Sequence, residues 1–393
     1  MILIKSSHIS EEGEFARITY QLEINEEKKA IWYEVPIAFK SYLSEDRIDP
    51  LVVGILPMAL GKGYNIVASD IYISRKLIEN LNHTLIPELL KRNISISKKM
   101  EIIAPTDETI LACEPRQVGT GMSCGVDSLF TYKGLEDSLT HLTNFNVGSH
   151  GGKKELFIQR MELSKKFTQE SGKQFISVDS NISEILNLPF EPTHVYRSAS
   201  AVLVLQKLFS AYYYSTGYAK SSFDFNTAPM SLDDDSAKYE HFLLPLLGTE
   251  GTSLISYGEE TRGEKILAIS SYPLAQRYLN VCVKTIDNCG TCEKCLRTQL
   301  SLYSQNKLQN FGQVFDLTKF NKHKHYFVSE LFYQRRNDKR EAIEEIRSDL
   351  LRNNLFRYNL KSYIRAACYT LKDNMYRVMQ KVGIADKHKR RIN

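Results

Sequence analysis

The first part of the chain carries two kinds of apolar and polar periodicity. Apolar and polar side chains alternate over residues 16–25 and 29–39, and this period of two predicts a pair of strands. The apolar run at 51–60 predicts a buried strand or another core segment, whereas Leu and Ile recur at helical spacing over 74–93. Residues 1–112 are therefore expected to form an N-terminal α/β domain.

After about residue 116 the pattern changes to strands that alternate with helices. Strands are expected at residues 117–123, 139–147, 173–180, 221–228 and 252–258. Helices are expected at residues 128–136, 154–171 and 194–216. This alternation predicts a parallel sheet with helices on both faces, in which ligands bind at the carboxyl ends of the strands.

The last part of the chain, residues 305–393, is basic and mostly helical in its periodicity, most clearly over 340–371. It contains 20 Lys and Arg against 9 Asp and Glu, an excess of 11, whereas the whole chain carries a net charge of +5. Such a bias is typical either of a region that binds a polyanion or of a solvated helical surface. We expect this region to be separate from a central domain at 113–304.

The overall composition is that of an ordinary globular protein, with 393 residues of which 42% are hydrophobic and 25% charged. The first residues lack the pattern of a signal peptide, and no apolar run approaches the ~18–20 residues that span a bilayer. We therefore expect a cytoplasmic protein without a membrane partner.

Four of the seven cysteines lie within fourteen residues, at Cys282, Cys289, Cys292 and Cys295. Spacings of two residues let thiolates converge on one ion, and Gly290 allows the tight turn after Cys289. Four thiolates around Zn²⁺ form a closed tetrahedral site, which predicts a structural metal. An iron–sulfur cluster is the alternative, because ferredoxins also use the spacing C-x2-C-x2-C. A disulfide pair fits this clustering least well.

The segment SCGVDS, residues 123–128, lies between an expected strand and an expected helix. Backbone amides and the positive end of the helix dipole make such a turn a site for an anion. The segment resembles the S-G-G-x-D-S signature of the PP-loop ATP pyrophosphatases, which cleave ATP to AMP and pyrophosphate while adenylating a substrate. The resemblance implies that ATP and Mg²⁺ are bound by the loop, whose residues are Ser123, Cys124, Gly125, Val126, Asp127 and Ser128. Asp127 and Ser128 are the expected catalytic residues, and Asp127 suits Mg²⁺.

Cys124 departs from that signature, because it replaces the first glycine. If the backbone there has a positive φ, the added Cβ costs about 1 kcal/mol. The thiol is either a reactive group activated by the helix N-terminus or a small inert side chain packed under the loop. We favour the inert interpretation, because the neighbouring residues already account for the site.

The loop and the cysteines together resemble 7-cyano-7-deazaguanine synthase and its relatives over residues 116–304. The resemblance implies a fold of the HUP or PP-loop type. It also implies an arginine in the nucleotide pocket, for which Arg197 is the candidate by approximate position. His194 lies one helical turn before Arg197, and the two residues form a surface pair in the alternative interpretation.

The function implied is that of an AMP-forming carbon–nitrogen ligase. It would adenylate a carboxylate, release pyrophosphate and pass the acyl group to ammonia or an amine. The expected acceptor is a small molecule or a larger one, such as a protein or a nucleic acid, and a homodimer is left open. The alternatives are a PP-loop enzyme that modifies tRNA, held by the basic region, and a non-catalytic sensor of adenine nucleotides.

One further polar group follows the last expected strand. It consists of Glu259, Glu260, Arg262, Glu264 and Lys265. This group suits the binding of substrate or ammonia, and it suits a solvated first helical turn equally well.

Overall fold

The computed structural model describes residues 1–93, 99–111, 114–149, 154–228 and 230–381. Within these ranges the chain divides into two compact units, which are described separately. The first unit comprises Met1–Ser123 and Gly134–Glu259, and the second comprises Cys124–Lys133 and Glu260–Asn393. The chain therefore passes into the second unit twice, once through a single short segment.

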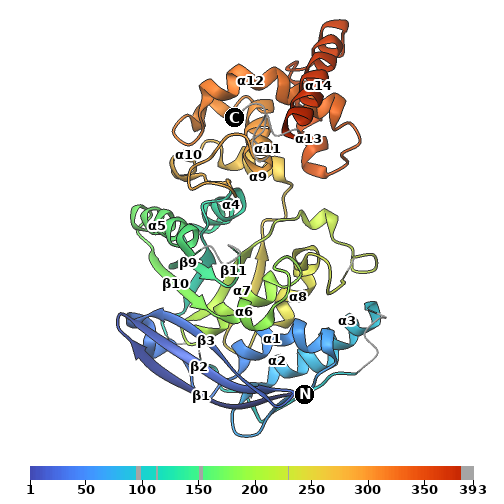
Figure 1. Cartoon of the computed structure of the whole chain (residues 1–393). Helices are drawn as coiled ribbons and strands as arrows, with labels where there is room; N and C mark the ends of the chain where they lie inside the picture. Colours follow the sequence, from blue (N-terminus) through green and yellow to red (C-terminus); the bar gives the residue numbers. More distant parts are fainter. Residues whose placement is uncertain (94–98, 112–113, 150–153, 229, 382–393) are drawn as a thin grey trace. The chain divides into compact units, whose positions relative to one another are not determined.

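The first unit is built on one ten-stranded sheet (Figure 1). Its order is β12-β11-β8-β9-β10-β3-β2-β1-β4-β6. The strands are β1 (Ile2–Glu12), β2 (Phe15–Ile24), β3 (Glu27–Pro36), β4 (Ile66–Ala68), β6 (Ile102–Ile103), β8 (Gln117–Gly121), β9 (His141–Asn146), β10 (Gln174–Ser180), β11 (Phe209–Ser215) and β12 (Ser253–Tyr257). Two short strands, β5 (Ile73–Ser74) and β7 (Thr106–Asp107), pair separately.

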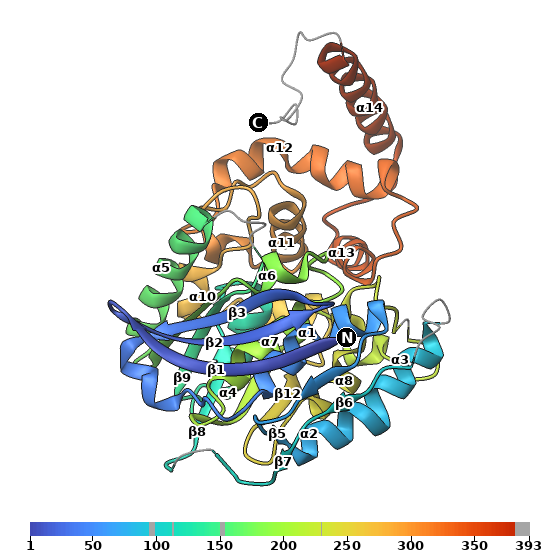
Figure 2. The same cartoon turned by 60° about the horizontal axis from the view of Figure 1, so that its bottom comes forward.

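Five neighbouring strands, from β12 to β10, are parallel. In chain order they read 5-4-1-2-3, so the order reverses between β8 and β11, as it does in doubly wound sheets. Three antiparallel strands, β3, β2 and β1, continue this sheet beyond β10 and lie side by side in Figure 2. The protein is thus an α/β protein with a large, mostly parallel central sheet. That sheet runs across residue 112, where the sequence suggests a domain boundary.

The helices of the first unit surround one continuous apolar core. They are α1 (Asp49–Lys62), α2 (Arg75–Asn80), α3 (Ile86–Arg92), α5 (Lys154–Glu170), α6 (Ile182–Leu186), α7 (His194–Val204) and α8 (Glu240–Leu246), with the short turns η1 (Ile37–Tyr42), η2 (Leu81–Leu85), η3 (Lys220–Ser222) and η4 (Ser236–Tyr239). The core joins side chains from Ile2 to Leu254, and α1 packs on α7.

Two predictions for this unit are wrong. The helix expected at 194–216 ends at Val204, and its second half is the strand β11, where three consecutive tyrosines favour a strand. No strand forms at 221–228, which contains η3 and a turn. The segment at 51–60 is the helix α1, and it is buried on all sides because α7 and the sheet enclose it. The long strand β1 was not expected from the sequence.

The second unit is helical among the residues that the structure describes. It contains most of α4 (Val126–Leu135), then α9 (Arg262–Ile269), α10 (Pro273–Tyr278), α11 (Glu293–Ser304), α12 (Leu317–Ser329), α13 (Glu341–Arg352) and α14 (Leu360–Lys381), with η5 (Leu308–Phe311) and η6 (Glu330–Gln334). The helix expected at 340–371 is divided, because the chain turns between α13 and α14.

No helix among the described residues is long and apolar enough to cross a membrane.

Candidate functional site

The motif loop follows β8 and opens α4, as the sequence predicts. At Cys124 the backbone has a φ of 55°, which is the left-handed region that glycine adopts without strain. The carbonyl oxygen of Cys124 accepts a hydrogen bond from the backbone N–H of Asn280 at 2.8 Å. The turn therefore has a conformation suited to glycine, although it carries a cysteine, and the Cβ costs about 1 kcal/mol.

The side chain of Cys124 is fully buried. Burial raises the pKa of this thiol far above its ordinary value. A thiol in such surroundings stays protonated and is inert, because the thiolate is the reactive form. This favours the packed interpretation of Cys124. Cys113, the other cysteine near the loop, lies outside the described residues.

The carboxylate of Asp127 faces two cations from α9. Its Oδ2 accepts a hydrogen bond from Nη1 of Arg262 at 2.6 Å, and its Oδ1 lies 3.7 Å from Nζ of Lys265. Both cations reach the same carboxylate because residues three apart share one face of a helix. Lys265 is buried, and the side chains of Arg262 and Asp127 are only 17% and 27% exposed.

A third cation, Arg297 of α11, contributes to the same electrostatic field. Burial and the neighbouring Arg262 guanidinium lower the pKa of Arg297, whereas Asp127 opposes that change. Burial alone would raise the pKa of Asp127, but the charges of Arg262 and Lys265 outweigh burial and lower it overall. Asp127 thus pairs with two cations and interacts electrostatically with a third, and we call Asp127, Arg262, Lys265 and Arg297 the charge cluster.

The charge cluster contains buried polar atoms without hydrogen-bond partners among the described residues. They are Oδ1 of Asp127, Nε of Arg262 and Nε of Arg297. Buried polar groups are nearly always hydrogen-bonded in folded proteins, so such atoms indicate a bound ligand or water. An excess of positive charge with free guanidinium donors suits an anion with several oxygen atoms, such as a phosphate.

The remaining loop residues form the first turn of α4 and the residues that precede it. The Ser128 hydroxyl donates a hydrogen bond to the carbonyl oxygen of Gly125 at 3.1 Å, and Val126 is buried. Ser123 is the last residue of the first unit before the chain enters the second. That these residues bind ATP stays a prediction.

Of the polar group at 259–265, only Arg262 and Lys265 join the charge cluster. Glu264 caps α9, because its carboxylate accepts from the backbone N–H of Thr261. Glu259 pairs with Lys220 within the first unit. Arg297 was not expected from the sequence, although it lies two residues after the metal-ligand candidate Cys295 on the same helix.

Arg197 is buried in the first unit, at the carboxyl ends of the parallel strands. Its guanidinium donates to the carbonyl oxygens of Val147 and Leu188 at 3.2 and 2.8 Å, and to the Ser183 hydroxyl at 3.1 Å. These bonds hold the segments that follow β9 and β10. Its Nε has no partner among the described residues. The expected role of Arg197 in a nucleotide pocket stays a prediction.

His194 does not form a surface pair with Arg197. Its Nε2 lies 2.9 Å from Oδ1 of Asp235, and its Nδ1 lies 2.8 Å from the hydroxyl of Tyr214. Tyr218 donates to the other oxygen of Asp235 at 3.0 Å. These bonds fix the segment before η4 to the first turn of α7.

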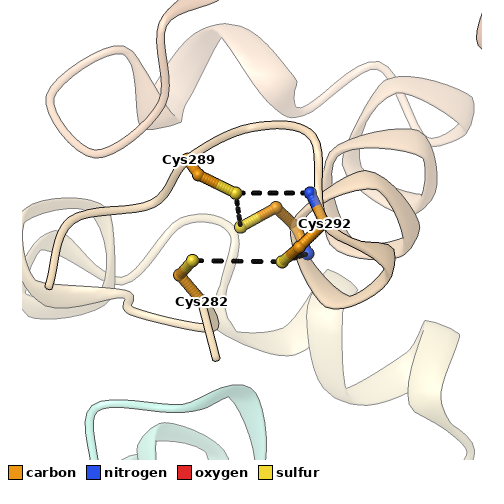
Figure 3. A group of neighbouring side chains, drawn as sticks. Cys282, Cys289 and Cys292 are labelled. Carbon is orange, nitrogen blue, oxygen red and sulfur yellow. Dashed lines mark hydrogen bonds between the residues drawn. The ribbon is translucent and has the colours of Figure 1, made fainter. Parts of the chain in front are cut away.

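The four cysteines of the second unit converge on one point. Their sulfur atoms all lie within 4.8 Å of one another, at 3.9 Å for Cys282 and Cys292 and 4.0 Å for Cys289 and Cys295 (Figure 3). Thiolates around one Zn²⁺ lie about 3.8 Å apart, which follows from Zn–S bonds of about 2.3 Å in a tetrahedron. The cysteines are unbonded to one another, since a disulfide requires about 2.05 Å.

The local backbone explains why the sulfur atoms meet. Gly290 has a φ of 73°, so the chain turns sharply between Cys289 and Cys292. Cys292 then caps α11, and its sulfur accepts from the backbone N–H of Cys295 at 3.5 Å. The backbone N–H of Cys292 points in turn at the sulfur of Cys289, at 3.3 Å. Amide donors and a helix N-terminus stabilise thiolates, the form that binds metal.

No model of a known protein family, no curated protein and no solved structure matches this chain. The site is therefore interpreted from its own residues and from the two sequence motifs.

Proposed function

We propose that the protein is an ATP-dependent, AMP-forming carbon–nitrogen ligase of the PP-loop type, similar to 7-cyano-7-deazaguanine synthase. The observation that carries this proposal is the charge cluster. Asp127, the acidic residue of the motif, pairs with Arg262 and Lys265 and interacts electrostatically with Arg297. Three cations near one carboxylate favour a polyphosphate, and a turn into the N-terminus of α4 adds backbone donors.

The work of these residues in the reaction is mainly electrostatic. A carboxylate of the substrate attacks the α-phosphorus of ATP, and pyrophosphate leaves. Arg262, Lys265 and Arg297 would stabilise the negative charge that accumulates on the departing pyrophosphate. Ammonia or an amine then attacks the acyl adenylate, and AMP leaves. Asp127 offers a carboxylate oxygen for Mg²⁺, because its Oδ1 lacks a hydrogen-bond donor among the described residues.

We also propose that the four cysteines hold one structural Zn²⁺. Their sulfur spacing is that of a single tetrahedral ion, and four thiolates leave no open position for catalysis. A four-iron cluster requires a wider cage than sulfur atoms within 4.8 Å provide. The ion would fix the start of α11, the helix that carries Arg297, and so support the charge cluster.

The test of the proposed function is the exchange of radiolabelled pyrophosphate into ATP, measured with a panel of carboxylic acids. The wild-type protein should catalyse this exchange with at least one acid and form AMP when an amine is added. Asp127→Asn should abolish it, and Arg262→Gln should lower its rate about 10²–10³-fold through the loss of a charged donor.

Arg357→Gln is the matched control, because Arg357 is an exposed arginine of the same unit and pairs with no acid among the described residues. Its exchange rate should equal that of the wild type. AMP formation that requires tRNA would support the tRNA-modifying alternative, and tight ATP binding without turnover would support the sensor. Unchanged activity in Asp127→Asn would refute the proposal.

A further inference from the structure

Helix α14 presents a row of large apolar side chains to solvent. Leu360, Ile364, Leu371, Met375 and Val378 are between 52% and 74% exposed, and they recur every three, four or seven residues. At 3.6 residues per turn this spacing places them on one face of the helix. We call these five residues the outer face of α14. The row spans about 27 Å at 1.5 Å per residue.

The opposite face of the same helix is packed against its own unit. Ala366 is buried, Tyr369 makes an edge-on ring contact with Tyr326 of α12, and Ser362 hydrogen-bonds the Tyr333 hydroxyl at 2.7 Å. Residues two apart point to opposite sides of a helix, so these contacts leave the outer face untouched. In Figures 1 and 2 the later turns of α14 extend past α12.

Basic residues border the outer face on both sides. Lys361, Arg365 and Lys372 follow one border, and Arg377 and Lys381 follow the other, as their helical spacing requires. The helix has five Lys or Arg and one acidic residue. Burial lowers the pKa of His325 on the adjacent helix α12, and Arg365 and Lys361 lower it further. The apolar row thus lies within a field of positive charge.

We propose that the outer face of α14 binds the surface of an anionic lipid bilayer. A basic amphipathic helix lies in the plane of such a surface, with its apolar side in the acyl region and its Lys and Arg near the headgroups. Over its first turns, up to Thr370, α14 is packed on its inner side, so a partner cannot enclose that part of the helix, whereas a flat surface requires the outer face only.

Charge and chemistry argue against the other occupants. A second copy would bring two positively charged borders together, and like charges repel. A nucleic acid would match the charge but would leave the apolar row without a partner, since the phosphate backbone is bound by cations. The sequence predicts no membrane partner, because it contains no apolar segment long enough to span a bilayer. That prediction concerns spanning and does not test binding at the bilayer surface.

The experiment is co-sedimentation of the full-length protein with vesicles of phosphatidylcholine, with and without phosphatidylglycerol. Binding should require the anionic lipid and weaken as salt is raised. Ile364→Gln/Leu371→Gln/Met375→Gln should weaken binding by about tenfold or more, because the apolar contact is lost. Lys372→Gln/Arg377→Gln should also weaken it and flatten its dependence on salt.

The matched control is Ile37→Gln/Ile103→Gln/Ile110→Gln, which changes three residues of the first unit that are 38%, 48% and 62% exposed. This variant should bind vesicles as the wild type does. Met375→Trp should add fluorescence that shifts to the blue with anionic vesicles only. Each variant should keep the circular dichroism of the wild type, since the changed side chains are exposed.

Three results would overturn the proposal. The first is wild-type protein that stays in the supernatant with anionic vesicles at low salt. The second is a dimer in sedimentation analysis that Leu371→Gln dissociates. The third is binding of RNA or DNA that depends on the outer face while vesicles are not bound.

Discussion

The interior of each of the two units is stabilised by a different set of interactions. The first unit has one contiguous apolar core that joins strands and helices from Ile2 to Leu254. The second unit also buries apolar side chains, such as Leu129, Phe320 and Leu350, but it adds four cysteines that meet at one point and the charge cluster around Asp127. Burial of apolar area stabilises the first unit directly, at about 25 cal/mol per Å². Buried charges stabilise little unless they are paired, so the charge cluster depends on specific partners in a way that an apolar core does not.

The two candidate sites lie in one unit. Asp127, Arg262, Lys265, Arg297 and the cysteines all belong to the second unit. Holding several cations close together costs stability, because like charges repel. A structural metal would compensate for that cost. The predictions below test whether the two units respond independently, as this comparison requires.

The largest effect is expected from loss of the proposed zinc. Cys292→Ser should release the metal and unfold much of the second unit, because such sites contribute about 10–16 kcal/mol in small zinc domains. The single tryptophan, Trp32, lies in β3 of the first unit, so its fluorescence should be unchanged while helical circular dichroism falls. Mass spectrometry should find about one zinc per chain in the wild type and a lower metal content in Cys292→Ser.

Cys368→Ser provides the control, since Cys368 is an exposed cysteine of α14 outside the cluster. It should keep both the metal and the helical signal. A brown wild-type protein with visible absorbance would indicate iron–sulfur in place of zinc. A change in Trp32 emission after loss of the metal would show that the units are not independent.

The next effect is expected from the apolar core of the first unit. Leu56→Ala in α1 removes a fully buried side chain and should cost about 2–5 kcal/mol. Urea unfolding followed by Trp32 fluorescence should shift to lower denaturant, while zinc content stays the same. Equal destabilisation of both units would contradict the comparison.

The fold was predictable where one periodicity dominates. Residues 117–123, 139–147 and 173–180 were expected as strands, and they contain β8, β9 and β10. The prediction failed over 194–216, where one long helix was expected and the chain forms α7 and then β11. For 51–60 the sequence left a strand or another core segment open, because a buried helix and a buried strand look alike, and the segment is α1.

The candidate site was predictable where its residues are close in the sequence. Four cysteines within fourteen residues indicated their convergence, and the structure brings them together. The contact between Asp127 and Arg262 joins residues 135 positions apart, and no local pattern encodes it. Arg297 can be recognised as a member of the charge cluster only from the three-dimensional structure. Tertiary packing, and not propensity, decides such pairs.

A smaller effect is expected at Cys124. Cys124→Gly and Cys124→Ala both remove the thiol, but only glycine relieves the positive φ, so the glycine variant should be the more stable by about 1 kcal/mol. Both variants should retain pyrophosphate exchange near the wild-type rate. Thermal unfolding measures the first difference. Inactivity of both variants would mean that the thiol takes part in the reaction.

Two carboxylates, one in each unit, should respond to acid in opposite ways. In the first unit, burial raises the pKa of Asp49 above its ordinary value, although Arg47 opposes this. The folded state then binds more protons than the unfolded state, so this group reduces stability as pH rises above about 4. In the second unit, hydrogen bonds from Arg340 and Arg335 lower the pKa of Asp338. The stability that the Asp338 carboxylate contributes to the folded state is present above about pH 4 and is lost on acidification.

The smallest effect follows from this opposition. Asp338→Asn should cost about 0.5–1 kcal/mol at neutral pH, because the pairs with Arg335 and Arg340 lie near the surface. As the pH falls from about 4 toward the lowered pKa of Asp338, the variant and the wild type should converge progressively in stability, since the wild-type carboxylate becomes protonated only there. Urea unfolding followed by circular dichroism at several pH values measures this difference. Asp49→Asn is the counterpart in the first unit. When urea unfolding is followed by Trp32 fluorescence, this variant should lose the fall in stability with rising pH that Asp49 causes. If the free energies of unfolding of Asp338→Asn and the wild type differed by the same amount down to the lowest pH, this carboxylate would not contribute to the pH dependence of the second unit.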